Sequence, residues 1–451
     1  MKYKNRKVLL SLQFIPFVLT NGMNLFPVLV LAQVFLKYRD INKYVLPLIL
    51  YFSFRTTVLF LARLKPIPSN QLLQISTVIG IVGSLFGSLY EVNLYFGLIA
   101  GSLLGICSGL LYPSYLSVQF HERHYNNFGI SKKEQAYSVG FAAVFTIVLY
   151  WLMARSIAIT FIYLALALLT ILIIVSVYPH YQIEEEEETV SYPIIESFFL
   201  FVTGFFVIFI IKAESKLGMS GSMPLFFAFL LILIVAYFIY LGKTKPERKL
   251  SPLLTQVIIF KGMITNFILV FCSFYQLLIE GGVALYKIYF FYLIAVIIAP
   301  LLYGVLLKRI PEVTLIKIIF VGIIGSFLLI IFPTTFYFGV MTLSIFSSQL
   351  NLRLNNRVYH NTTLPRDLRL LGKYRLNNVG SVLQQLLMMF VLFIVTTVFG
   401  TVSMDDILQA YSYKSAEASA VFTLNIVKYL LVMMFISGLF YLRNKAKKET
   451  L

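Results

Sequence analysis

The sequence has few charged residues, few cysteines and a single tryptophan for a chain of its length. Only 12% of its 451 residues are charged, whereas 59% are hydrophobic. Soluble domains carry about 25% charged and roughly 45–50% apolar residues. A soluble fold of this length is therefore excluded, because it could not bury so much apolar surface. The two cysteines, Cys107 and Cys272, lie in apolar runs without a CxxC or metal-type neighbour, which is typical of small buried hydrophobic residues.

Motifs for catalysis and metal binding are lacking as well. The sequence contains no P-loop, no H-E-x-x-H and no G-x-S-x-G. His121 and His124 are three residues apart, but no further ligand accompanies them, and we interpret them as a polar helix end at the membrane interface. The sequence therefore predicts no enzyme activity, no metal and no cofactor.

What the sequence does have is a series of long apolar runs. A helix needs about 20 apolar residues to cross the bilayer core. The basic segment Met1–Lys7 resembles the start of a signal peptide, but the apolar run Val8–Phe35 is too long for one and no cleavage pattern follows it. We expect fourteen membrane-spanning helices, near residues 8–36, 44–64, 70–90, 94–119, 137–154, 157–178, 193–211, 223–241, 253–279, 288–307, 314–332, 335–350, 377–399 and 421–442.

The positive charges predict the orientation of these helices. If the N-terminus is cytoplasmic and every segment crosses, 25 of the 37 Lys and Arg residues lie inside, eight outside and four within helices. Inner loops of membrane proteins carry such an excess of Lys and Arg. We therefore expect a multi-pass plasma-membrane protein with both termini in the cytoplasm. The net charge of +18 then reflects topology, and no nucleic-acid partner is expected.

One predicted inner loop is acidic rather than basic. Five consecutive glutamates occupy Glu184–Glu188. Acidic residues contribute little to helix orientation, so the predicted topology is unchanged. The run is either a solvated linker or a docking point for a basic protein partner or cation.

The two halves of the chain show an internal repeat. A shift of 245 residues places most early segments on later ones, and it places Asn21 on Asn266 and Pro66 on Pro311. Six helices per half keep the same direction, as in transporters built from parallel repeats. We therefore predict an all-α polytopic protein with two six-helix bundles and two inserted helices. The predicted domains are a first bundle at 1–178, an acidic linker at 179–192, an inserted pair with a basic linker at 193–252, and a second bundle at 253–451.

The loop Ala62–Asn70 lies where the major facilitator superfamily carries a Gly/Asp/Arg-rich signature. Arg63 and Lys65 keep its basic character, whereas the glycines and the aspartate are missing. The layout resembles the fourteen-helix form of that family, as a divergent member. The resemblance implies secondary transport by rocking of two bundles, with the basic residues of the short inner loops as gating residues. These residues are Arg63, Lys65, Lys308 and Arg309.

Cations inside predicted helices are the candidate binding residues. Ionisable groups within a membrane are costly and usually face a bundle interior or a cavity. Arg55 lies near the middle of its segment, and Lys261 lies about eight residues into its own. No Asp or Glu lies mid-membrane in this topology, which argues against a carboxylate proton site and favours an anionic ligand. Asn21, Asn24 and Asn266 are candidate polar lining residues, although interhelical hydrogen bonds explain them equally well.

Three functions remain open from the sequence. The first is a secondary transporter that exports or flips a small anionic or amphiphilic substrate. The second is a flippase for lipid-linked saccharides of the multidrug/oligosaccharide class. The third is a membrane scaffold or sensor that transports nothing and binds a partner at Glu184–Glu188.

Overall fold

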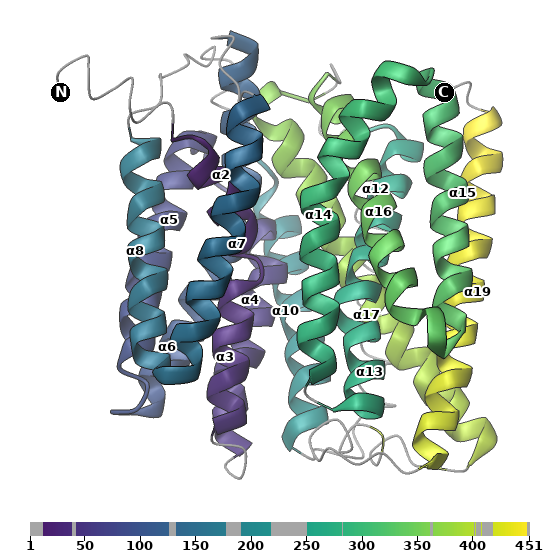
Figure 1. The fold of residues 1–451 in the computed structure, drawn as a ribbon, viewed down its shortest axis with the longest axis horizontal. Helices are drawn as coiled ribbons and strands as arrows, with labels where there is room; N and C mark the ends of the chain where they lie inside the picture. Colours follow the sequence, from purple (N-terminus) through teal and green to yellow (C-terminus); the bar gives the residue numbers. More distant parts are fainter. Residues whose placement is uncertain are drawn as a thin grey trace. The chain divides into compact units, whose positions relative to one another are not determined.

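The computed structural model describes most of the chain as helices (Figure 1). The described residues are 12–37, 42–125, 132–176, 191–217, 250–281, 283–360, 364–400, 402, 407 and 418–448, and they contain no strand. Ten helices in this part of the chain are long and apolar enough to cross a membrane, and 46–61 and 194–210 are shorter apolar helices. The chain is an all-α multi-pass membrane protein, as predicted.

Thirteen of the fourteen predicted spans correspond to helices in the described residues. The predicted span at 223–241, the run Glu184–Glu188 and the basic segment Met1–Lys7 lie outside them. The helices are α2 Phe14–Gly22, α3 Phe26–Lys37, α4 Leu46–Leu61, α5 Ser69–Ser88, α6 Leu94–Tyr125, α7 Lys132–Arg155, α8 Ile157–Val175, α10 Ile194–Leu217, α12 Pro252–Asn266, the π-helix η3 Phe267–Cys272, α13 Ser273–Glu280, α14 Val283–Arg309, α15 Glu312–Ile331, α16 Phe336–Tyr359, α17 Arg366–Phe399 and α19 Ala418–Lys448.

The chain forms two compact units. Unit 1 comprises Met1–Ala213, Phe227–Arg248 and Leu364–Tyr374, and unit 2 comprises Glu214–Phe226, Lys249–Thr363 and Arg375–Leu451. The first turns of α17 therefore belong to unit 1, although the rest of this continuous helix belongs to unit 2. The domain boundaries expected from the sequence stay a prediction.

In unit 1, glycines bring α6 against the backbone of α4. A Cβ atom on Gly101 would lie 2.1 Å from the carbonyl oxygen of Pro47, and one on Gly105 would lie 2.6 Å from that of Tyr51. These distances are too short for any side chain, so Gly101 and Gly105 form a close helix-packing face.

The first helix of unit 1 is broken at Met23–Leu25, between α2 and α3. Pro27 has no N–H, so it cannot donate the helical hydrogen bond to the carbonyl of Met23 four residues earlier. That carbonyl accepts hydrogen bonds from Ser108 Oγ at 2.6 Å and from Tyr51 Oη at 3.4 Å instead. Side chains of α4 and α6 therefore satisfy the group that the break exposes.

Unit 2 repeats the internal pattern of unit 1. In unit 1, α4 and α5 pack on α6, and in unit 2, α14 and α15 pack on α16. The 245-residue shift places the break at Met23–Leu25 on residues 268–270, inside the π-helix η3. Both first helices are thus irregular at the same position of the repeat, although neither irregularity follows from apolar spacing.

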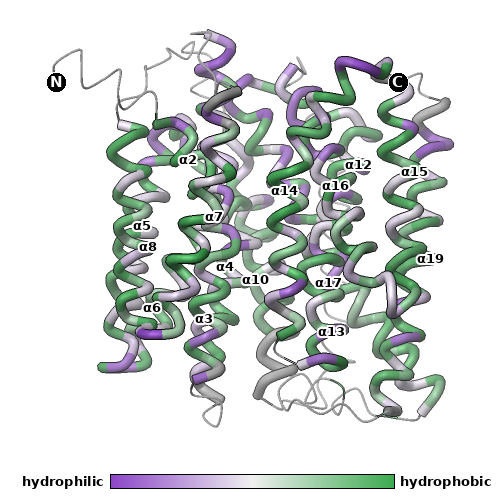
Figure 2. The backbone as a smooth tube through the Cα atoms, viewed as in Figure 1, coloured by the Kyte–Doolittle hydropathy of each residue, from purple (hydrophilic) through white to green (hydrophobic). Residues whose placement is uncertain are grey.

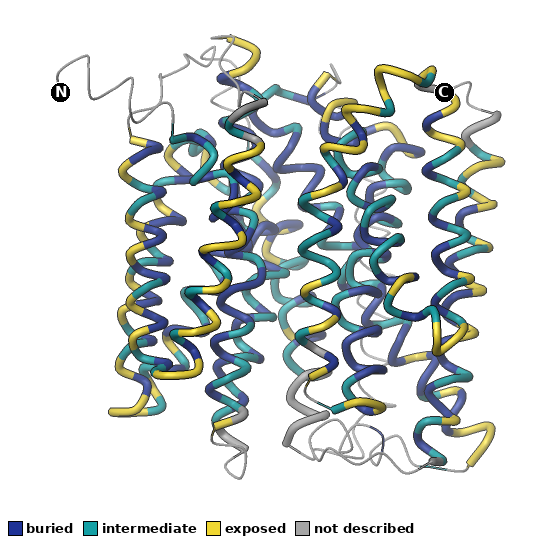
Figure 3. The backbone as a smooth tube through the Cα atoms, in the orientation of Figure 1, coloured by how far each residue is buried: buried dark blue, intermediate teal, exposed yellow. Residues whose placement is uncertain are grey.

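Large apolar side chains remain exposed along the helices. Ile147 and Tyr150 on α7 and Val321 on α15 are each more than half exposed. Figure 2 shows that the helices are coloured mainly as hydrophobic, and Figure 3 shows exposed stretches running along them. Surfaces of this kind are expected to face lipid in a membrane protein.

Candidate functional site

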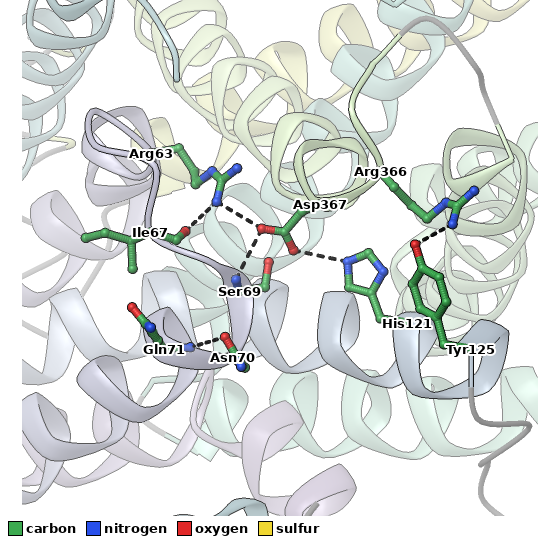
Figure 4. A network of polar contacts seen from close by, with 9 residues as sticks. All are labelled: Arg63, Ile67, Ser69, Asn70, Gln71, His121, Tyr125, Arg366 and Asp367. Atoms are coloured by element: carbon green, nitrogen blue, oxygen red, sulfur yellow. Dashed lines mark hydrogen bonds and ion pairs between the residues drawn. The ribbon is translucent and has the colours of Figure 1, made fainter. Parts of the chain in front are cut away.

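A buried polar network in unit 1 centres on the carboxylate of Asp367, in the first turn of α17 (Figure 4). Oδ2 accepts a hydrogen bond from Arg63 Nη1 at 3.0 Å and one from the backbone N–H of Ser69 at 3.2 Å. Oδ1 lies 3.0 Å from Nε2 of His121 on α6. The side chains of Arg63, His121 and Asp367 are at most 1% exposed. The network therefore joins three elements around one desolvated ion pair.

The local sequence explains why Asp367 is needed here. Helix α5 follows Pro68, which supplies no side-chain cap, so the backbone N–H of Ser69 lacks an intrahelical partner. The Asp367 carboxylate accepts from this N–H, and its negative charge lies at the positive end of the α5 dipole. A residue almost 300 positions later in the chain thus caps α5.

The backbone of Arg63 is held in an unusual conformation. Its φ is +65°, and it is the one non-glycine residue with positive φ in the described ranges. Such conformations cost about 1–3 kcal/mol and persist where surrounding contacts impose them. Here Arg63 Nη1 also donates to the Ile67 carbonyl at 2.5 Å, and the Arg63 carbonyl accepts from the N–H of Tyr192 at 3.0 Å.

Further contacts hold the start of α17 in unit 1. Arg366 donates a hydrogen bond to the Tyr125 hydroxyl and lies 5.2 Å from its ring centroid. Tyr374 packs edge-on against Tyr112 with ring centroids 5.6 Å apart. The first turns of α17 are thus attached to α6 at two points besides Asp367.

Of the four predicted gating residues, the structure brings Arg63 into this network. Lys65 follows it in the same loop but is exposed. Lys308 and Arg309 end α14 in unit 2, and both are exposed. The repeat therefore relates Arg63 to Lys308 in sequence, although their surroundings differ.

The predicted binding residue Arg55 lies on α4 of unit 1, one helical turn after Tyr51, whose hydroxyl reaches the broken helix. Its Cζ is 6.0 Å from the ring centroid of Tyr51, and it is half-buried. The Tyr51 hydroxyl donates to the carbonyls of Met23 and Asn24 at the break, each at 3.4 Å. No carboxylate in the described part of the chain pairs with Arg55. Asn21, by contrast, donates at 2.7 Å to the Phe17 carbonyl within α2.

In unit 2, the predicted residues Lys261 and Asn266 both lie on α12. Lys261 is buried, with 7% of its surface exposed. Asn266 Nδ2 donates to the Ser381 carbonyl at 3.0 Å and to Gln384 Oε1 at 2.5 Å, so it joins α12 to α17. Arg55 and Lys261 belong to different units.

Sequence reasoning missed Asp367, and it interpreted His121 as an interfacial residue. A signal for Asp367 was present, because it is the one acidic residue among six basic ones in the predicted inner loop at 351–376. Tyr51 gave no signal, because it is one of 29 tyrosines in an apolar chain. Its role follows from the helix break, which the apolar pattern does not reveal.

Comparison with known proteins finds solved structures that are similar to this chain in fold. No family model and no curated protein matches the sequence. A solved structure concerned with substrate recognition in proton dependent oligopeptide transporters aligns with a TM-score of 0.52 and 11% identity, over 96% of this chain and 99% of that one. A POT family transporter in complex with a thioalcohol conjugated peptide aligns with a TM-score of 0.51 and 13% identity, over 97% and 96%.

At these identities the likeness concerns the fold, and it extends over nearly the full length of both chains. The helices in the described residues, their repeated packing and the interrupted first helix of each unit agree with it. The chain therefore shares the overall fold of these solved transporter structures.

Proposed function

We propose that this protein is a secondary transporter that moves an anionic or amphiphilic small molecule across the plasma membrane by alternating access. The observation that carries the proposal is that Arg55 lies one helical turn from Tyr51, which hydrogen-bonds to the backbone at the break in the first helix of unit 1. Interrupted helices commonly form the binding sites of secondary transporters, since their free backbone groups lie at the ligand. Arg55 adds a planar cationic donor there, suited to a carboxylate or phosphate.

The surroundings of Arg55 support binding of an anion from outside the protein. A guanidinium within a membrane is costly, and such residues usually pair or mark a substrate pathway. Tyr51, its neighbour, is neutral and is engaged with the backbone at the break. An anionic substrate group would supply the missing counter-charge, and Asn24, which lies in the break itself, is a further polar candidate.

The Asp367 network supports a gating role for Arg63. Asp367 holds the first turns of α17 in unit 1, whereas the rest of the helix belongs to unit 2. Movement of one unit against the other would bend α17 or break the buried ion pair. We assign the network as the lock of one transport state, with Lys65, Lys308 and Arg309 as exposed basic residues of the same inner face. Both termini are cytoplasmic in this proposal.

Transport is tested in vesicles that contain the purified full chain. Small anions loaded as a mixture are followed by mass spectrometry in vesicles with the wild type, Arg55→Gln, Arg155→Gln or no protein. Arg155 is a suitable control because it lies at the end of α7, stacked 4.2 Å from the Trp151 ring centroid. We expect at least one anion to cross with the wild type and Arg155→Gln but about tenfold more slowly with Arg55→Gln, the effect of losing ~1.4 kcal/mol of binding.

Equal anion flux in vesicles with Arg55→Gln and with the wild type contradicts the assignment of Arg55 as a substrate-binding residue. If no anion crosses but a lipid-linked saccharide does, the flippase is the correct function. A chain that moves neither compound under any condition supports the scaffold.

A further inference from the structure

A second polar site lies where α12 crosses α17 in unit 2. Glycines allow the two backbones to touch there. A Cβ on Gly262 would lie 2.1 Å from the Asn377 carbonyl oxygen, and one on Gly380 would lie 2.0 Å from that of Ile259. Asn266 fastens the crossing through its bonds to Ser381 and Gln384.

Buried polar atoms around this crossing are left without partners. Asn266 uses the oxygen of Gln384, but the Nε2 group of Gln384 has no hydrogen bond, and neither does Oδ1 of Asn377. Gln349 Oε1, on the helix α16 that packs against α12, is also without one. All three side chains are more than nine-tenths buried.

Lys261 adds a positive charge to this group. It directly precedes Gly262, so its backbone lies at the crossing. Its ammonium makes no hydrogen bond or ion pair with any residue that the structure describes. The contrast with Lys428 is clear, because that buried lysine of unit 2 donates to the Tyr275 hydroxyl at 3.0 Å and to the Ile331 carbonyl at 2.9 Å.

Unpaired groups of this kind are rare in proteins. Buried polar atoms are almost always hydrogen-bonded, and an unpaired one costs about 1–3 kcal/mol. Gln384 and Asn377 supply two such atoms on α17 at this crossing, and Gln349 supplies a third on the helix that packs against α12. Together with the unpaired ammonium of Lys261, they indicate an occupant that completes their bonds. The chemistry of that occupant follows from the groups themselves. Lys261 and Gln384 Nε2 need acceptors, whereas Asn377 Oδ1 and Gln349 Oε1 need donors.

We propose that Lys261, Gln349, Asn377 and Gln384 bind a small hydroxylated carboxylate, such as a sugar acid. The carboxylate accepts from Lys261 and Gln384, and the hydroxyls donate to Asn377 and Gln349. The inference rests on the proposed function, because it names the class of substrate and the residues of unit 2 that hold it.

Each unit contains one buried cysteine, and this allows binding to be measured without transport. Cys107 lies in unit 1 and Cys272 in unit 2. Purified protein is heated with a maleimide, and mass spectrometry reports the labelling midpoint of each cysteine. Three six-carbon probes separate the chemistry: gluconate has both groups, hexanoate has the carboxylate alone, and sorbitol has hydroxyls alone.

We expect millimolar gluconate to raise the Cys272 midpoint by at least about 2 °C, and by more than the Cys107 midpoint, because a ligand stabilises the state that binds it. Hexanoate and sorbitol should raise it by less than half as much. Lys261→Met and Asn377→Leu should remove the gluconate shift. Lys317→Met, which changes an exposed lysine of α15, should keep it.

No gluconate shift in the wild type, or an equal shift in Lys261→Met, overturns the inference. If Lys261→Met does not fold, Lys261→Gln serves instead, and an unchanged preference for gluconate over hexanoate in Asn377→Leu has the same meaning. A gluconate shift without gluconate flux contradicts the transporter alone, whereas flux of another anion that depends on Arg55, without a gluconate shift, contradicts the inference alone.

Discussion

At the scale of single residues, the buried carboxylate of Asp367 makes three polar interactions with other parts of unit 1. One carboxylate serves an arginine, a histidine and a helix N-terminus, and all of them are buried. Composition alone could not predict this, because the outcome depends on folding together positions hundreds of residues apart. The sequence did predict a gating role for Arg63, since a basic residue in a very short loop after an apolar helix is a local feature, and that role stays a prediction.

Removing the charge of Asp367 is expected to destabilise the protein strongly. Asp367→Asn removes the carboxylate that pairs with the buried Arg63, and breaking a buried pair in this way costs about 3–5 kcal/mol. The measurement is the thermal unfolding midpoint of the purified protein. A midpoint within a degree of the wild type contradicts the network.

The matched control is Glu91→Gln, which removes an exposed ion pair. Lys37 donates to Glu91 at 2.7 Å and Tyr90 donates at 2.9 Å, and these hydrogen bonds lower the pKa of the Glu91 carboxyl. The lowered pKa stabilises the folded state at pH values above the unfolded-state pKa. This stabilisation is lost as the pH falls through the folded-state pKa. Because both side chains are about half exposed, Glu91→Gln should change stability by less than about 1 kcal/mol at neutral pH.

Reversing the ion pair should not rescue the protein. The double variant Arg63→Asp with Asp367→Arg keeps opposite charges in contact, but it places a cation at the N-terminus of α5 and beside His121. Helix N-termini favour anions and repel cations. We expect the double variant to unfold at or below the midpoint of Asp367→Asn, as followed by circular dichroism. Recovery to the wild-type midpoint would show that the pair alone matters.

At the scale of elements, hydropathy located the helices but not their irregularities. All predicted spans that fall on described residues correspond to helices, because about 20 apolar residues form a signal that lipid requires. The break between α2 and α3 and the π-helix η3 were not predicted, since apolar residues continue through both. Helix α17 begins eleven residues before its predicted span, because its charged first turns are buried within unit 1 rather than exposed.

The α4–α6 contact provides a prediction for a single methyl group. In Gly101→Ala the new Cβ would overlap the Pro47 carbonyl, so α6 must move away from α4. Overpacking of this kind costs about 1–3 kcal/mol. The control is Gly325→Ala on α15, where a Cβ meets no atom within 4 Å. That variant should be neutral or slightly stabilising, since alanine favours helix more than glycine does. The thermal unfolding midpoints of the two variants, measured side by side, test this prediction, and equal midpoints contradict it.

At the scale of the whole molecule, the apolar runs and the repeat predicted the fold class correctly, whereas the residues around Arg55 and Lys261 needed the structure. Positive charges favour the cytoplasmic side during insertion, so they predict the orientation of the helices.

Cysteine labelling tests the predicted orientation. Single cysteines are introduced at Val92, Val283, Lys65 or Lys308 in a chain with Cys107→Ala and Cys272→Ala. We expect an impermeant maleimide to label positions 92 and 283 in intact cells, and positions 65 and 308 after permeabilisation.

Labelling of position 308 in intact cells, with position 65 still protected, would mean that an odd number of helices separates them. That result would contradict the fourteen-helix topology. Val92 and Val283 are well exposed, so burial does not explain a failure to label them.

The Asp367 network also sets the order of events during synthesis. Arg63 and Ser69 are made 304 and 298 residues before the carboxylate that completes them. At about 5–20 residues per second, translation takes roughly 15–60 s to cover that interval. Throughout it, Arg63 lacks its Asp367 partner and the N-terminus of α5 lacks the carboxylate that caps it. The nascent first half must therefore be protected until α17 emerges, and a chain truncated before α17 should be a preferred target of membrane quality control.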